Sequence, residues 1–66
     1  MNVTINGAVH ELPSGATVSQ AVQKLTAARS GVAVAVNDEV VSRGAWDSTV
    51  LTEADRVEVL TAVQGG

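Results

Sequence analysis

The amino-acid sequence predicts an α+β fold, in which a mixed sheet of four to five strands carries one amphipathic helix on a single face. Three observations predict it. The pair Asn6-Gly7 separates two short alternating runs, one stretch has helical periodicity, and further β-rich runs follow that stretch. Because the chain has only 66 residues, we expect one small domain with a thin core.

The first predicted element is a β-hairpin. Apolar and polar residues alternate over residues 2–6 and again over residues 8–12, with Asn6-Gly7 between the two runs. The apolar members are Val3, Ile5, Val9 and Leu12. Asn and Gly both tolerate positive φ, which a tight two-residue turn requires. We therefore predict two antiparallel strands joined at this pair.

A helix is predicted over residues 17–29. Thr17 and Gln20 fit a capping box, in which the Thr17 hydroxyl accepts from the Gln20 amide and the Gln20 side chain reaches back. The apolar stripe that follows has helical spacing and consists of Val18, Ala21, Val22, Leu25 and Ala28. Arg29 suits the negative end of a helix, and Gly31 is a candidate C-cap.

Three strands are predicted after the helix. In residues 32–37, we expect the valines to face the helix, while Ala33 and Ala35 leave the opposite face shallow and apolar. Asp38-Glu39 is predicted to turn the chain into a short strand at residues 40–41. The last strand covers residues 56–61, with its valines inward. Its expected outward residues are Arg56, Glu58 and Leu60.

Between these last two strands, residues 42–55 are predicted to be irregular. They contain Trp46, which we expect to cover the end of the sheet rather than to anchor a partner. A hairpin, a crossover helix and returning strands describe the β-grasp, or ubiquitin-like, fold, whose last strand lies centrally and parallel to the first. Residues 1–61 are then the domain, and residues 62–66 are expected to form a flexible C-terminal tail.

Composition excludes several classes of function. The chain has no cysteine, which removes disulfides and thiol chemistry. Its net charge of −3 and its single aromatic residue argue against nucleic acid as a partner. His10 is the only histidine, so we expect no metal site, no bound cofactor and no catalytic residue. No signal peptide or membrane-spanning run is seen, so we expect a cytoplasmic protein, without membrane contact and monomeric on its own.

The reactive group that remains is the C-terminal carboxylate of Gly66. Glycine lacks Cβ, so Gly65, preceded by Gln64, suits a tail that threads a narrow channel into another enzyme. A carboxylate is a poor electrophile and needs activation, normally as an acyl-adenylate. We therefore expect the tail to be a substrate of other enzymes.

Over its whole length the chain resembles the ThiS family of small bacterial sulfur carriers. The residues that carry the resemblance are Val3-Thr-Ile-Asn6, Val34-Ala-Val-Asn37, Val40-Val-Ser-Arg43 leading to Trp46, Asp55 before Val57-Glu-Val-Leu60, and Val63-Gln-Gly-Gly66. The resemblance implies that a ThiF-type enzyme adenylates Gly66 with ATP and magnesium. Sulfur from a cysteine desulfurase persulfide then makes a thiocarboxylate, which thiazole synthase, ThiG, uses to build the thiazole of thiamin.

A docking face is expected beside the tail, where Leu60, Ala33 and Ala35 form an apolar set that the helix does not cover. Three other functions remain open at this point. The chain is also compatible with a sulfur carrier for molybdopterin or an amino-acid pathway, with a protein-conjugating modifier, and with a β-grasp binding module such as an RNA-binding domain.

Overall fold

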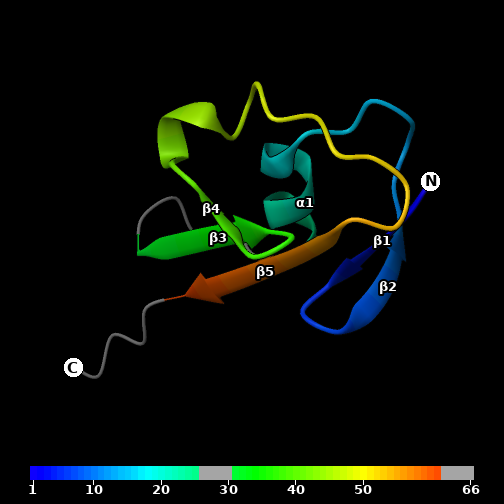
Figure 1. Ribbon diagram of the computed structural model, residues 1–66, viewed down its shortest axis with the longest axis horizontal. Coiled ribbons are helices and arrows are strands. Elements are labelled where there is room, and N and C mark those ends of the chain that lie inside the picture. Colours follow the sequence, from blue (N-terminus) through cyan, green and yellow to red (C-terminus); the bar gives the residue numbers. More distant parts are fainter. Residues whose placement is uncertain (26–30, 62–66) are drawn as a thin grey trace.

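The structure, a computed structural model, describes residues 1–25 and 31–61 and contains one five-stranded mixed sheet with a helix packed on it (Figure 1). The elements are β1 (Asn2–Ile5), β2 (Ala8–Glu11), α1 (Val18–Leu25), β3 (Val32–Val36), β4 (Glu39–Val41), the 3₁₀ turn η1 (Arg43–Ala45) and β5 (Arg56–Thr61). The strand order is β2-β1-β5-β3-β4. Because β5 lies centrally and runs parallel to β1, the predicted β-grasp topology is confirmed.

The first hairpin forms at the predicted pair. Asn6 and Gly7 have φ values of 51° and 83°, as the tight turn requires. On β2, however, Val9 points away from the core and is 70% exposed. Leu12 follows the end of β2 and is buried.

Helix α1 begins with the predicted capping contact. The Gln20 side-chain oxygen accepts from the Thr17 amide at 2.8 Å. Three members of the apolar stripe are buried against the sheet, namely Val18, Ala21 and Val22. The predicted continuation of the helix, including Ala28 and Arg29, lies outside the described residues.

The second hairpin corrects the sequence-based prediction. The turn lies at Asn37-Asp38, with φ values of 50° and 71°, and not at Asp38-Glu39. Glu39 instead begins β4 and pairs with Val36. A two-residue hairpin turn needs positive φ at both central positions, and Asn at the first of them tolerates it better than most residues.

The core lies between α1 and the inward face of the sheet. Val34 is almost fully buried, with Val32 and Val36 packed beside it, as predicted for the valines of β3. Trp46 is buried as well, and its indole Nε1 donates to the Val41 carbonyl at 3.0 Å. Trp46 is therefore part of the core and is not an exposed anchor for a partner. The other core residues are Val3, Ile5, Leu12, Ala16, Val18, Ala21, Val22, Leu51, Val57 and Val59.

Candidate functional site

Strand β5 brings the chain to Thr61, which is exposed at the surface. It pairs with β1 on one side, where Ile5 lies opposite Val57, and with β3 on the other, where Val32 lies opposite Thr61. Thr61 is the last described residue of this strand. The residues predicted to be modified or to thread into a partner, Gly66, Gly65 and Gln64, follow it in the sequence and lie outside the described residues.

Alternation along β5 separates the core from the opposite face of the sheet. Val57 and Val59 are 1% and 4% exposed, so their side chains anchor the strand in the core. The outward residues are those predicted, namely Arg56, Glu58 and Leu60. Burying two valines holds the strand in register, because a slip of one residue would turn both of them to water.

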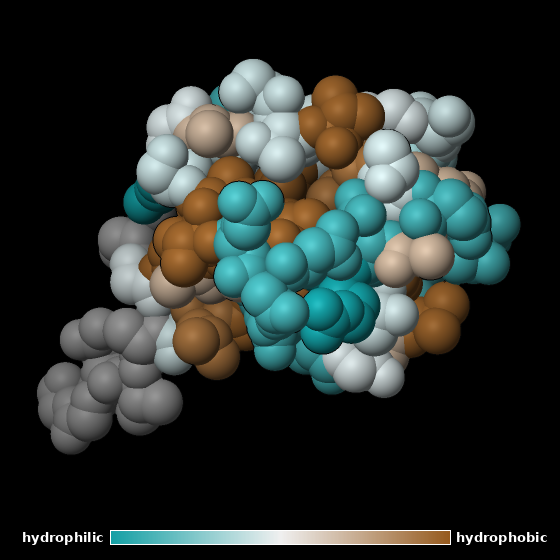
Figure 2. Space-filling view, viewed as in Figure 1, coloured by the Kyte–Doolittle hydropathy of each residue, from teal (hydrophilic) through white to brown (hydrophobic). Residues whose placement is uncertain are grey.

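An apolar patch lies on the outward face beside the end of β5. Leu60 is 70% exposed and pairs with Ala33, while Ala35 pairs with Val40 on the neighbouring strand. The structure thus brings together Leu60, Ala33 and Ala35, and adds Val40, which is 83% exposed. We call these four residues the outward patch. In Figure 2, apolar surface gathers at the part of the molecule where β5 ends.

The outward patch is hollowed. A shallow depression of about 160 Å³ is lined by Ala33, Val34, Ala35, Val40, Glu58 and Leu60. A second depression of about 400 Å³ shares Ala33 and Leu60 with the first and extends to Thr61. The small alanine side chains are what leave the room, because Ala35 stands between Val40 and Glu58, and Ala33 stands beside Leu60. The apolar surface therefore runs up to the last described residue of β5.

Sequence reasoning missed Val40. It placed Val40 in a short strand but did not assign either of the two adjacent valines to a face. The signal is strand alternation: Val40 lies opposite Ala35, and a two-residue turn at either Asn37-Asp38 or Asp38-Glu39 puts Val40 on the same outward face.

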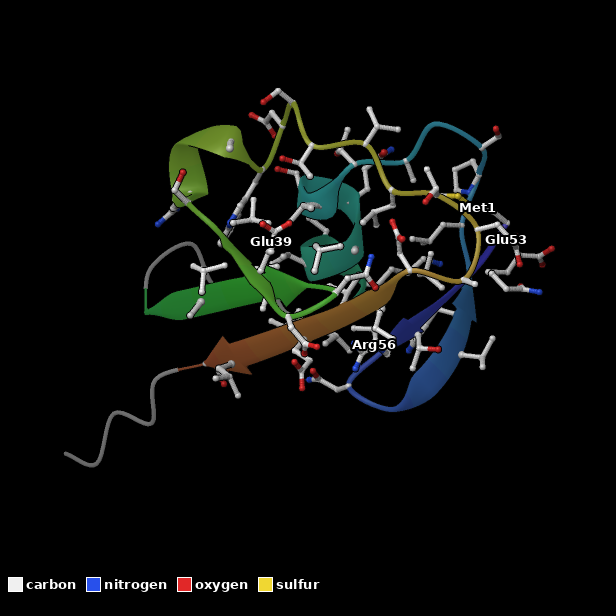
Figure 3. All side chains as sticks on the ribbon, in the orientation of Figure 1. Met1, Glu39, Glu53 and Arg56 are labelled. Atoms are coloured by element: carbon white, nitrogen blue, oxygen red, sulfur yellow. The ribbon has the colours of Figure 1, made fainter. Side chains whose placement is uncertain are left out.

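Charged groups border the patch. Arg56 Nη2 lies 2.9 Å from Asp38 Oδ2, and both side chains are more than half exposed. Figure 3 labels Arg56 on β5 and Glu39 on β4, while Met1 and Glu53 lie at the other end of the sheet. An exposed ion pair of this kind contributes little to stability.

The second hairpin is tied to β5 by side chains at its turn. The Asn37 amide group donates to Asp55 Oδ1 at 3.0 Å, and the Asn37 side-chain oxygen accepts from the Arg56 amide at 3.0 Å. Burial acts to raise the pKa of Asp55, but hydrogen bonds from the Thr52 amide, the Asn37 side chain and the Thr52 hydroxyl outweigh it and hold this pKa below its ordinary value. These contacts fix where β5 begins.

Within residues 1–25 and 31–61, no three His, Asp or Glu side chains are grouped so that they could hold a metal ion. His10, on β2, is half-buried. The helix in that part of the chain is too short to cross a bilayer.

Comparisons with known proteins agree on one family. The sequence profile of the ThiS family matches residues 3–66. The sulfur carrier protein ThiS of Escherichia coli is 24% identical to this chain, and the alignment covers the whole of both proteins. A thiazole synthase of Magnetococcus marinus is 38% identical over all 66 residues, which make up only 20% of that relative; the chain thus spans about a fifth of its length.

Solved structures match as well. The crystal structure of the thiamine biosynthesis protein (ThiS) from Geobacter metallireducens has a TM-score of 0.79 and 33% sequence identity, with full coverage of both chains. The solution structure of a thiamine biosynthesis protein from the same organism has a TM-score of 0.80 and 33% identity, covering all of this chain and 88% of the other.

Proposed function

This chain belongs to the ThiS family and is a sulfur carrier of thiamin biosynthesis, and from this premise we propose that Gly66 holds the sulfur as a thiocarboxylate. One observation carries the proposal: the central strand β5 ends at Thr61, on the surface, and the family match continues from there through Gly66. The terminal carboxylate thus follows, five residues later in the sequence, a strand that the fold anchors.

The chemistry at Gly66 begins with activation. A carboxylate oxygen of Gly66 attacks the α-phosphate of ATP in a ThiF-type adenylating enzyme, with magnesium, and pyrophosphate leaves. The product is an acyl-adenylate, in which the carbonyl carbon has become a good electrophile. The outer sulfur of a persulfide on a cysteine desulfurase attacks this carbon and displaces AMP, which gives an acyl disulfide. A thiol of the sulfur-donating partner then attacks the inner sulfur and breaks the S–S bond. The partner is left with a disulfide, and the outer sulfur remains on Gly66 as a thiocarboxylate. In this scheme ATP and magnesium are bound by the partner.

The outward patch supports docking of the adenylating enzyme. Its apolar depressions lie against β5 and extend to Thr61, so a partner seated there would be next to the start of residues 62–66. Five residues in extended geometry reach about 16 Å, which is enough to carry Gly66 from the sheet into a partner's active site. Gly65 and Gln64 are the residues that would thread.

Thiazole synthase is the proposed acceptor of the sulfur. The 38% identical relative is itself a thiazole synthase, and this chain matches one fifth of its length. A sequence of this kind within a thiazole synthase supports a direct partnership between the two activities. We place the reactions in the cytoplasm, where ATP and a persulfide donor are both present.

Intact mass spectrometry tests the proposal. The chain is incubated with ATP, magnesium, a ThiF-type enzyme and a persulfide donor. A mass gain equal to the exchange of one oxygen for one sulfur, confined to the C-terminal peptide, is the expected result. A variant that lacks Gly66 is the control and should gain nothing. No gain in the intact chain, with a partner that is active on another ThiS protein, would rule out the carrier role.

A further inference from the structure

Backbone pairing between β1 and β5 stops early on β5. The Thr4 amide donates to the Asp55 carbonyl at 2.9 Å, and the Asn6 amide donates to the Val57 carbonyl at 3.0 Å. There the first hairpin reverses at Asn6-Gly7. Alternate residues of a strand turn their amide and carbonyl groups to opposite neighbours, so Val59 is the next residue of β5 that faces β1.

The side chain of Asn6 binds Val59 in place of the backbone of β1, which has turned away. Its Nδ2 donates to the Val59 carbonyl at 3.0 Å, and its Oδ1 accepts from the Val59 amide at 2.8 Å. A carboxamide offers the same donor and acceptor as a peptide unit. It therefore continues the parallel ladder by one step after the backbone has turned away, and it reaches β5 two residues before Thr61.

The turn conformation makes this contact possible. Asn6 has a φ of 51°, in the left-handed region that Asn adopts more readily than most residues. The two hydrogen bonds are partly buried, so water competes for them less than at an exposed position. Residue 6 thus meets two requirements at once, a turn conformation and a carboxamide directed at β5.

We propose that Asn6 is a positioning residue for the reaction at Gly66. By binding Val59 from the β1 side, it fixes the course of the last residues of β5. The reactive residues follow these in the sequence. The opposite side of this segment is held by β3, where Ala33 and Val32 pair with Leu60 and Thr61. With both sides held, β5 keeps one direction up to Thr61. This role rests on the function proposed above.

The expected consequence is kinetic. If Asn6 no longer holds Val59, the end of β5 samples more directions, and the adenylating enzyme must order it on binding. The Michaelis constant for the carrier should then rise, while turnover of the bound complex stays the same. Two hydrogen bonds are lost, but each contributes little after exchange with water, so we expect a rise of about three- to tenfold.

The test compares Asn6→Gly with Asn37→Gly. Glycine accepts positive φ, so each variant keeps its turn and loses only the side chain. Asn37 is the matched control because it has the same conformation, with φ 50°, and also binds β5, but at Arg56, where the strand begins. Pyrophosphate release by a ThiF-type enzyme is measured against carrier concentration, and hydrogen exchange of the Val59 amide is followed in parallel.

We expect Asn6→Gly to raise the Michaelis constant about three- to tenfold and to speed Val59 exchange, and Asn37→Gly to change the constant by less than about twofold. Equal Michaelis constants for the two variants would overturn the positioning role. Asn6→Asp, which keeps the shape but cannot donate to the Val59 carbonyl as a carboxylate, should behave as Asn6→Gly. A wild-type chain that is never adenylated would instead remove the proposed function, while Val59 exchange would still report on the contact itself.

Discussion

Leu60 lies opposite Ala33 across the β3–β5 ladder, on the face of the sheet that α1 does not cover. Leu60 is 70% exposed, and the small Ala33 side chain leaves an apolar depression beside it. A large aliphatic side chain next to such a depression is costly to leave in water and favourable to cover. The pair therefore marks the part of the outward patch where substitution should have the greatest effect on binding.

Leu60→Asp should weaken binding to the adenylating enzyme at least about tenfold, because it places a charge at the centre of a buried contact, and leave the fold intact. Titration calorimetry measures the affinity, and circular dichroism checks the fold. Val9→Asp is the matched control, since Val9 is also 70% exposed but lies on the edge strand β2. Unchanged affinity for Leu60→Asp, or an equal loss for Val9→Asp, would contradict docking at the outward patch.

Trp46→Phe should lower the free energy of unfolding by about 1–3 kcal/mol. The substitution removes the indole donor to the Val41 carbonyl and reduces the volume that fills the end of the core. Urea unfolding followed by circular dichroism measures the loss. Arg43→Ala is the comparison. The Arg43 Cζ atom lies 5.5 Å from the centroid of the Trp46 ring, at an exposed position. Removing this side chain should lower the free energy of unfolding by about 0.5–1 kcal/mol. A larger loss for Arg43→Ala than for Trp46→Phe would disprove this account.

Acid should destabilise the chain partly through Asp55. Its pKa in the folded chain is below the ordinary value of 3.8, so the charged form stabilises the fold. That contribution is fully present above the ordinary value and is lost as pH falls through the lower folded pKa. Asp55→Asn should therefore show a smaller loss of unfolding free energy than the wild type between about pH 5 and pH 2, measured by urea titration at several pH values. Identical pH profiles would show that Asp55 does not contribute.

Arg56→Met should change the free energy of unfolding by less than about 1 kcal/mol. The ion pair with Asp38 is short, at 2.9 Å, but its side chains are 58% and 72% exposed, so water and salt screen it. Thermal unfolding at low and high salt measures the effect. A loss well above this limit, or one that high salt leaves undiminished, would mean that the pair is more shielded than its exposure indicates.

Much of the fold was predictable because the relevant signals are local. The Asn6-Gly7 turn follows from the backbone freedom of its own two residues, and the start of α1 follows from a capping contact between Thr17 and Gln20. The faces of β5 follow from simple alternation, with Val59 inward and Leu60 outward. Each of these features is decided within a few residues of the chain, where geometry leaves few options.

The second hairpin was placed one residue too late, and the reason is physical. Asn37, Asp38 and Glu39 are all polar and can stand in a turn, so local composition does not choose among the possible pairs. The choice is made by the register of β3 against β4, in which Val36 pairs with Glu39. The outward patch is one residue larger than predicted for a different reason: no face was predicted for Val40, which lies opposite Ala35.

The sequence by itself determined the fold class and singled out Gly66, because no other part of the chain has reactive groups of the right kind. Only the tertiary structure decided how the end of β5, which precedes Gly66 in the sequence, is held. The Asn6 carboxamide meets Val59, which lies 53 positions later, and no local pattern reveals such a contact. The contact exists because Val57 and Val59 pack into the core and so hold β5 beside β1. The Asn6-Gly7 turn then directs the Asn6 carboxamide at the backbone of Val59.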